Sequence, residues 1–235
     1  MVKFLQYIEN GIRYNRIGDC KVAVAGFGID MDVKHVRIPT LLKNGNRVIW
    51  ITPSAFEKNI TIESIVLPDT ISLIGENAFY KCPNLKEVVI SHQDDWDLLE
   101  QDMPVEIQKR AFSGCRNLTT FSSCKSIKLR GSLVFHNCVL LPKIIGKIYG
   151  DLPEKSFLNC MSLKEFEFFD ETTLFENNCF DDCPNLSKFY LYQDLDLNEE
   201  FLTRFKDATF YCIPDSKYLS LAYHGHNIKK ILPRV

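Results

Sequence analysis

The chain has 235 residues, of which 46% are hydrophobic, and its 28 basic and 30 acidic residues give a formal net charge of −2. This composition is typical of a folded globular protein, and the absence of a basic excess argues against nucleic acid as a partner. No apolar run approaches the ~20 residues that span a bilayer, so we expect no membrane insertion. Gln6 and Glu9 interrupt the apolar N-terminus, which therefore does not read as a signal peptide. The sequence predicts a cytoplasmic protein, or a cell-surface or secreted one if an export signal has been removed.

Short segments that alternate apolar and polar residues recur along the chain, beginning with residues 33–39. Because successive side chains of a strand point to opposite faces, this period of two predicts short strands with one buried face. We expect these strands to pair in parallel. The residues predicted to point inward are Ile62, Ile65 and Leu67, then Leu85, Val88 and Ile90, then Leu163, Phe166 and Phe168, and then Leu186, Phe189 and Leu191.

A phenylalanine precedes most of these strands, with a cysteine three residues later and a leucine three residues after that. Successive phenylalanines are 23, 33, 23, 22 and 23 residues apart. A repeat this short cannot enclose a core by itself, so neighbouring copies must stack and share one. We expect a buried structural ladder of Phe56, Phe79, Phe112, Phe135, Phe157 and Phe180 with Cys82, Cys115, Cys138, Cys160 and Cys183.

The nine cysteines are better explained by packing than by disulfides, because nine is odd and five share one repeat position. Free cysteine behaves as a small buried hydrophobe, and reduced thiols fit a reducing compartment. The spacings do not form a zinc-binding pattern, so no metal and no cofactor is expected.

A second apolar pair follows most strands on the return side of each repeat. Ile71 and Ile74 show it best, and Tyr149 and Leu152 fall on the same positions. Gly75 and Gly131 lie four residues before a ladder phenylalanine. A glycine there predicts a tight corner with a positive φ.

The segment 62–85 joins an alternating strand to Ile74-Gly75, Ala78-Phe79, Cys82 and Leu85. It resembles the BspA-type (Treponema pallidum-like) leucine-rich repeats. The resemblance implies an α/β-type repeat solenoid that is mostly β. Such a solenoid is a right-handed leucine-rich-repeat coil with short parallel strands on its concave face, few helices and a cap at each end. It implies one continuous domain, with an N-terminal cap at 1–32, repeats at 33–192 and a C-terminal cap at 193–235 that contains a helix starting at Asp215 or Ser216.

Two regions are candidate binding surfaces. The outward strand residues become richer in charge and tyrosine towards the C-terminus, at Glu165, Glu167, Lys188, Tyr190 and Tyr192. Tyrosine is enriched in binding hot spots, although such residues can also be ordinary solvated side chains. The other region is an insertion at about 91–102 that contains Trp96, which either binds a partner or packs against the solenoid edge.

The sequence contains no P-loop, no dinucleotide-binding glycine motif and no motif of a hydrolase or zinc protease. We therefore expect a non-enzymatic module that binds a protein partner through the concave strand face and the rim insertion. The resemblance adds an alternative, a cell-surface adhesin or host-interaction protein of a microbe, since family members are often bacterial surface proteins. A glycan-active enzyme that uses Glu165 and Glu167, and a scaffold that oligomerises through the concave face, are further alternatives.

Overall fold

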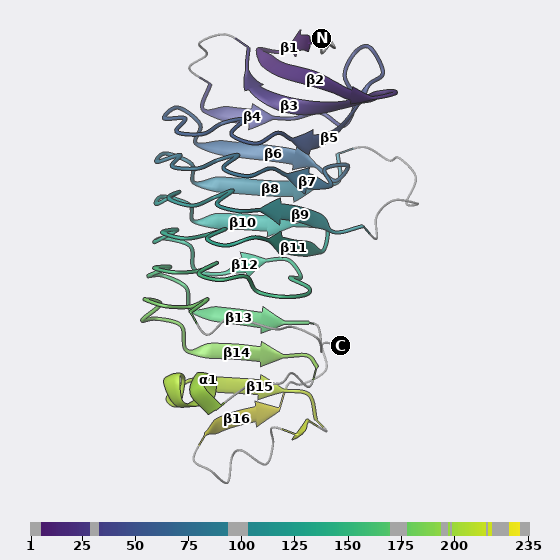
Figure 1. The fold of residues 1–235 in the computed structure, drawn as a ribbon. Coiled ribbons are helices and arrows are strands. Elements are labelled where there is room, and N and C mark those ends of the chain that lie inside the picture. The colour runs from purple at the N-terminus through teal and green to yellow at the C-terminus, as the bar shows by residue number, and fades with distance from the viewer. Residues whose placement is uncertain are drawn as a thin grey trace.

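The computed structural model describes residues 6–28, 33–93, 103–169, 178–193, 197, 199–214, 216–217 and 226–230. Within them the chain forms a stack of coils in which each turn adds a short strand beside the strand of the turn before (Figure 1). The described residues contain one α-helix, α1 (Glu199–Arg204), so the fold is mostly β, as predicted.

The N-terminal strands form an antiparallel meander of β1 (Gln6–Glu9), β2 (Ile12–Gly18) and β3 (Lys21–Phe27). Asn10 and Gly11, with φ of 48° and 76°, connect β1 to β2. Positive φ at both central residues is what a two-residue hairpin turn requires. β3 then pairs in parallel with β5 (Arg47–Ile51), the first of the return-side strands. β7 (Leu73–Ile74), β9 (Val105–Gln108) and β11 (Ile127–Arg130) follow it in that order, each parallel to the strand before.

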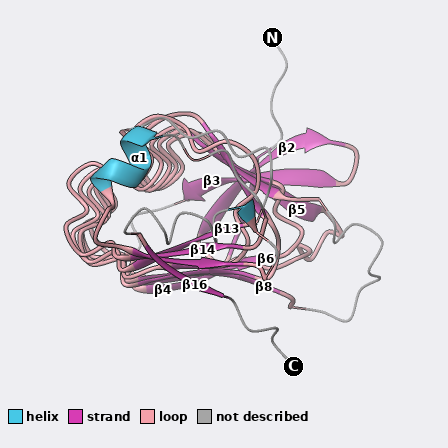
Figure 2. Cartoon of the chain, turned by 90° about the horizontal axis from the view of Figure 1, so that it is seen from below, coloured by secondary structure: helices cyan, strands magenta, loops and turns pink. Residues whose placement is uncertain are grey.

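The main strands form two parallel sheets along the other side of the stack. The first contains β4 (His35–Arg37), β6 (Ser64–Pro68), β8 (Glu87–Ser91), β10 (Thr120–Ser123) and β12 (Ile144–Ile145). The second contains β13 (Glu165–Phe168), β14 (Lys188–Leu191), β15 (Thr209–Cys212) and β16 (Asn227–Lys230). In a view along the stack, these strands superimpose on one side and the connecting loops on a neighbouring side (Figure 2).

A continuous column of phenylalanine rings fills the interior. Phe112 is fully buried and stacks on Phe79 at 5.1 Å and on Phe135 at 5.4 Å between ring centroids, with interplanar angles of 5° and 7°. The same stacking extends to Phe56 at one end and through Phe157 to Phe180 at the other. The leucine and isoleucine residues predicted to point inward from the strands are buried around this column, which confirms those predictions.

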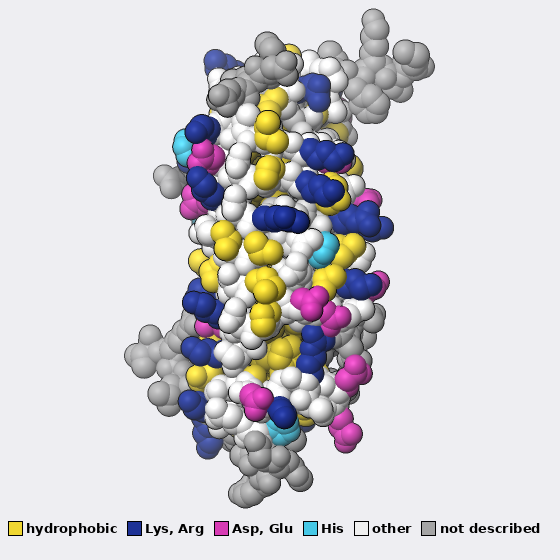
Figure 3. All heavy atoms as spheres, turned by 90° about the vertical axis from the view of Figure 1, so that its left-hand side faces the viewer, with side chains coloured by type: hydrophobic (Ala, Val, Ile, Leu, Met, Phe, Trp, Pro, Cys, Tyr) yellow, Lys and Arg dark blue, Asp and Glu magenta, His cyan; other side chains and the backbone are white. Residues whose placement is uncertain are grey.

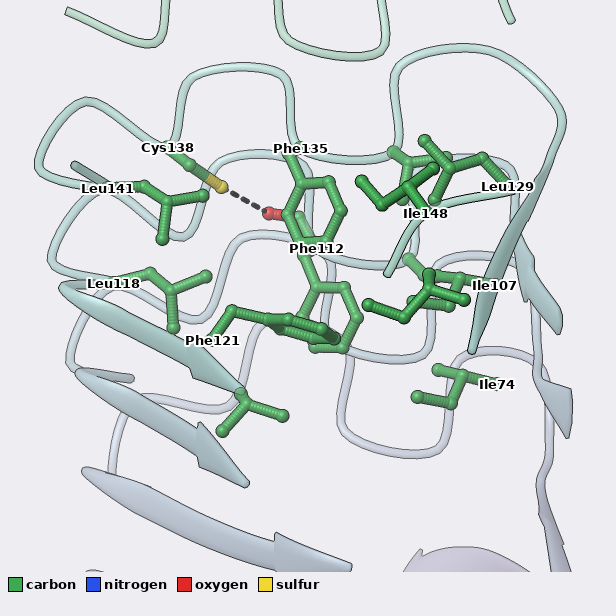
Figure 4. Close-up of a cluster of buried hydrophobic side chains, with 14 of the residues drawn as sticks. Ile74, Ile107, Phe112, Leu118, Phe121, Leu129, Phe135, Cys138, Leu141 and Ile148 are labelled. Atoms are coloured by element: carbon green, nitrogen blue, oxygen red, sulfur yellow. Dashed lines mark hydrogen bonds between the residues drawn. The ribbon is translucent and has the colours of Figure 1, made fainter. Parts of the chain in front are cut away.

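Each ladder cysteine donates its S–H to the backbone carbonyl of the phenylalanine one coil earlier. Cys138 bonds Phe112 in this way (Figure 4), and across the five cysteines the S···O distances lie between 3.0 and 3.3 Å. A thiol is a weak donor that is cheap to desolvate, so it satisfies a buried carbonyl without placing a strongly polar group in the core. None of the nine cysteines forms a disulfide.

The loops that follow the phenylalanines are also held from coil to coil. The second residue after each ladder phenylalanine has a positive φ in every repeat. Its backbone N–H donates to a carbonyl of the next coil, with N···O distances of 2.7–2.9 Å, at Lys58, Lys81, Gly114, Asn137 and Asn159. Asn84, Asn117 and Asn185 occupy another shared position and donate their side-chain amides to carbonyls of the preceding coil at 2.6, 2.8 and 2.6 Å. Leu140 holds that position in the coil of Phe135 and is 45% exposed.

Two sequence predictions about the return side need correction. Gly75 does not adopt a positive φ. Glycine is required there because a Cβ would lie 2.5 Å from the backbone nitrogen of Pro53. Gly131, with φ of 117°, does turn as predicted. Tyr149 was expected to point inward, but it is only half-buried, and Ile148 beside it fills the core.

In the coil that leads to β15, α1 lies where the other coils have a loop (Figure 2). Phe201 of this helix and Phe205, which directly follows it, meet the ring of Phe189 edge-on at 5.1 and 4.9 Å. The sequence analysis did not predict α1. Most of the helix expected from Asp215 or Ser216 and most of the insertion, including Trp96, lie outside the described residues. The domain boundaries proposed from the sequence stay predictions.

Candidate functional site

The outward side chains of the parallel strands form two rows, which we call the strand face. Strand register places Glu165 beside Lys188, followed by Thr209 and Asn227, in the first row. In the second row the aligned residues are Arg37, Val66, Val89, Ser122 and Ile145 in the N-terminal sheet, and Glu167, Tyr190, Tyr211 and Lys229 in the C-terminal sheet. The second row therefore changes from mainly aliphatic to aromatic and charged along the stack.

Two pairs of parallel aromatic rings lie at the C-terminal part of this face. Tyr190 of β14 stacks on Tyr211 of β15 with centroids 4.6 Å apart and an interplanar angle of 11°. Phe169, just after β13, stacks on Tyr192, just after β14, at 4.7 Å and 9°. All four side chains are partly exposed. We call these four residues the aromatic cluster. Parallel pairing in register holds these rings one strand spacing apart, which is close to a stacking distance.

A lysine ammonium lies over one outer face of each ring pair. The Lys229 ammonium lies 5.9 Å from the Tyr211 centroid, and the Lys147 ammonium lies 5.8 Å from the Phe169 centroid. Such cation–π contacts add about 0.5–1 kcal/mol each at exposed positions. The four rings are partly exposed, and three of them are tyrosines that carry a hydroxyl. A surface of this kind offers hydrogen bonds and apolar contact at once.

Charges surround the cluster. Lys143 bonds Glu165 at 2.9 Å, and this partner raises the pKa of the Lys143 ammonium above its ordinary value. Desolvation, followed by the nearby carboxylate of Glu165, raises the pKa of Tyr190 above its ordinary value. Its hydroxyl therefore stays protonated at neutral pH and is available as a hydrogen-bond donor.

The geometry gives no support to catalysis by Glu165 and Glu167. The hollow that both border, between β12 and β13, has a volume of about 10 Å³, which is far too small for a sugar ring. A larger groove of about 710 Å³ lies between Pro104 and Pro153 on the return side, and among the described residues that line it Asp151 is the one with a carboxylate. Glycoside hydrolysis ordinarily needs a pair of carboxyl groups. Among the described residues, no group of three potential metal ligands is present, and no helix is long and apolar enough to cross a membrane.

The structure brings Glu165, Glu167, Lys188, Tyr190 and Tyr192 together on one patch. The ladder phenylalanines and cysteines lie in the interior, away from this surface. Sequence reasoning missed Tyr211, Phe169 and Lys229 as members of the patch. The sequence did contain a signal for Tyr211, since Thr209-Phe-Tyr-Cys212 repeats the pattern of Lys188-Phe-Tyr-Leu191.

Parallel strands stacked around one shared core define the class of this protein as a leucine-rich-repeat solenoid. Residues 35–95 and 100–212 match six copies of the family described as BspA type leucine rich repeat region. This match covers more than half of the chain, which therefore belongs to that family. No curated protein matches the chain.

Solved structures show the same fold. The leucine-rich-repeat protein TpLRR of T. pallidum is 16% identical with a TM-score of 0.51, and the alignment covers 96% of this chain and 98% of that one. A leucine-rich-repeat protein from Bacteroides ovatus is 19% identical with a TM-score of 0.54, covering 96% of this chain and 67% of that one. The fold and family predicted from the sequence are thereby confirmed.

Proposed function

We propose that this protein is a non-enzymatic module that binds a protein partner through the strand face, with the aromatic cluster as its anchor. The observation that carries the proposal is the pair of ring stacks, which are partly exposed and flanked by Glu165, Glu167 and Lys188. Amphipathic aromatic rings supply large contact areas with little loss of conformational freedom, and they dominate binding hot spots.

A peptide or protein surface fits this arrangement better than a glycan does. Sugars usually stack on a free aromatic face, whereas the inner faces here pair with one another and the outer faces of Tyr211 and Phe169 are covered by lysines. The alternating carboxylates and ammonium groups supply charged contacts that set orientation and exclude wrong partners.

The rim insertion at 91–102 is proposed as a second contact, with Trp96 as its anchor. A Trp96→Ala variant with an unchanged melting temperature and weakened partner binding supports a binding role. A large fall in melting temperature assigns Trp96 to packing instead.

Site-specific photo-cross-linking tests the proposal. A photoreactive amino acid that replaces Lys188 is expected to capture a partner protein. The same amino acid in place of Glu87 should not capture that protein. Glu87 is a matched control because it is exposed and occupies the first row of the same face. With the captured protein purified, Tyr190→Ala combined with Tyr211→Ala should raise Kd at least about tenfold.

The control for that measurement is Val66→Ala combined with Val89→Ala, which alters the second row in the N-terminal sheet and should leave Kd within about twofold. Equal weakening by both double variants, or none by the tyrosine pair, would show that the aromatic cluster is not the anchor. The alternative role as a microbial surface adhesin uses the same face. It is favoured if the captured protein comes from a host cell surface.

A further inference from the structure

The loops between each ladder phenylalanine and the following leucine form a second continuous surface, which we call the loop edge. The residue that directly follows the cysteine position of each repeat is exposed in most coils. These residues form an apolar row of Ile60, Pro83, Val139, Met161 and Pro184, which Arg116 interrupts. Ile60 is 67% exposed and Met161 is 43% exposed. Figure 3 faces this edge and shows hydrophobic side chains following the long axis of the molecule. An exposed apolar row of this length is typical of an interaction surface, even with one arginine in it.

A second row runs beside it and carries a charge gradient. The positive-φ residues of successive coils are Lys58, Lys81, Gly114, Asn137, Asn159 and Asp182. The row therefore begins with two cations, is uncharged in the middle and ends with an anion. Lys58, Lys81 and Asp182 are all exposed, and Lys58 has only a long contact of 3.5 Å to Glu57 among the ion pairs of the described residues.

The spacing along both rows is regular because the interior sets it. Successive ladder rings stack with centroids 5.1–5.6 Å apart, and backbone bonds of 2.7–2.9 Å join the loops from coil to coil. Two copies of the same edge therefore share one spacing and can align coil for coil.

We propose that two copies of this chain associate antiparallel, loop edge against loop edge, about a two-fold axis perpendicular to the long axis of the solenoid. Such an axis keeps each row opposite itself and reverses its order, as in any isologous interface. Lys58 then lies opposite Asp182 of the second copy, with Lys81 one coil away. Ile60 lies opposite Pro184, and Pro83 lies opposite Met161.

The middle of the edge is compatible with this arrangement. Arg116 falls opposite Val139 of the second copy and beside Leu140, where its aliphatic stem covers apolar surface while the guanidinium reaches the rim. The Lys58–Asp182 contacts fall at the two ends of the edge, and apart from Arg116 the row between them is apolar, as is usual at the centre of protein interfaces. The strand face lies on a different side of the solenoid (Figure 2), so a dimer of this kind leaves the aromatic cluster accessible.

Sedimentation equilibrium of the full chain over a range of protein concentrations tests the proposal. We expect a monomer–dimer equilibrium that weakens at high salt. Lys58→Glu should raise the dimer dissociation constant at least about tenfold, because the symmetric interface contains the contact twice and each copy becomes repulsive. Lys21→Glu makes the same charge change at an exposed residue of β3, and it should have little effect.

The decisive variant combines Lys58→Glu with Asp182→Lys, which restores opposite charges with reversed polarity and should recover the wild-type dimer. Met161→Asp, at an exposed residue that the fold does not require, should dissociate the dimer without lowering the melting temperature. A chain that stays monomeric at every concentration overturns the proposal. A dimer that is insensitive to Met161→Asp, or is not recovered by the charge swap, also overturns it.

Discussion

Replacing Phe112 with alanine should be among the most damaging single changes in this protein. The ring is fully buried, stacks on both neighbouring ladder rings and also meets Phe121 edge-on at 5.3 Å. Truncating a buried phenylalanine costs about 3–5 kcal/mol, and each aromatic pair adds about 0.5–1.5 kcal/mol beyond area burial. With three such pairs lost, we expect Phe112→Ala to lower the free energy of unfolding by about 5 kcal/mol.

Phe56→Ala is the matched comparison. This ring has one stacked neighbour and one edge-on neighbour, Phe79 and Phe27, and is 3% exposed. Its truncation should cost about 1 kcal/mol less than that of Phe112 because one ring contact fewer is lost. Urea denaturation followed by circular dichroism measures both costs. If Phe112→Ala lowers the free energy of unfolding by less than about 1 kcal/mol, or by less than Phe56→Ala does, the reasoning is refuted. Rings in the middle of a shared phenylalanine column make the most ring contacts and should be the costliest to remove.

The cysteine ladder, the loop edge and one surface ion pair each supply a further prediction. Cys138→Ala removes a buried S–H···O bond and leaves a small void, so urea denaturation should show a loss of about 1–2 kcal/mol, whereas the exposed Cys124→Ala should stay within about 0.5 kcal/mol. Leu140→Asn should raise the melting temperature and gain about 0.5–1 kcal/mol, because asparagine at this position in other coils donates to a carbonyl of the coil before; a lower melting temperature would show that Leu140 packs usefully. Hydrogen bonds from Lys86 and Lys34 lower the pKa of Glu63 to about 2 in the folded protein, so its stabilising contribution is present above the ordinary carboxyl pKa and is lost as pH falls towards 2. Acid titration of Glu63→Gln should therefore lack this part of the pH dependence, and an unchanged acid profile would contradict the assignment.

The inward strand residues were predictable because alternation leaves little choice once one face is buried. Leu85, Val88 and Ile90 follow this rule, and the ladder phenylalanines recur at a spacing that only stacking explains. The target of the cysteine thiols was not predictable, because it depends on the rise from one coil to the next. The loop position with a positive φ was not predictable from the sequence either, because lysine, glycine, asparagine and aspartate all occupy it.

The candidate site was predicted in part. Tyr190 and its charged neighbours were recognised from their outward positions on strands. Tyr211 was missed because its segment was interpreted as a terminal cap, although it continues the same parallel pairing. Gly75 was assigned to the right corner for the wrong reason, since a positive φ and a close backbone approach both select glycine and only coordinates distinguish them.

The main strands divide into two separate sheets between β12 and β13, and this break has a mechanical consequence. On the strand side, the backbone bond from Lys164 to Pro142 and the Lys143–Glu165 ion pair still cross it, and the loop bonds and the stacked rings of Phe135 and Phe157 continue through it. Because the ladder of strand bonds is interrupted there, we expect stretching along the length of the molecule to meet less resistance at this junction than within either sheet. Under tension we expect the domain to part at this junction first, leaving the tyrosine-bearing end as an intact block.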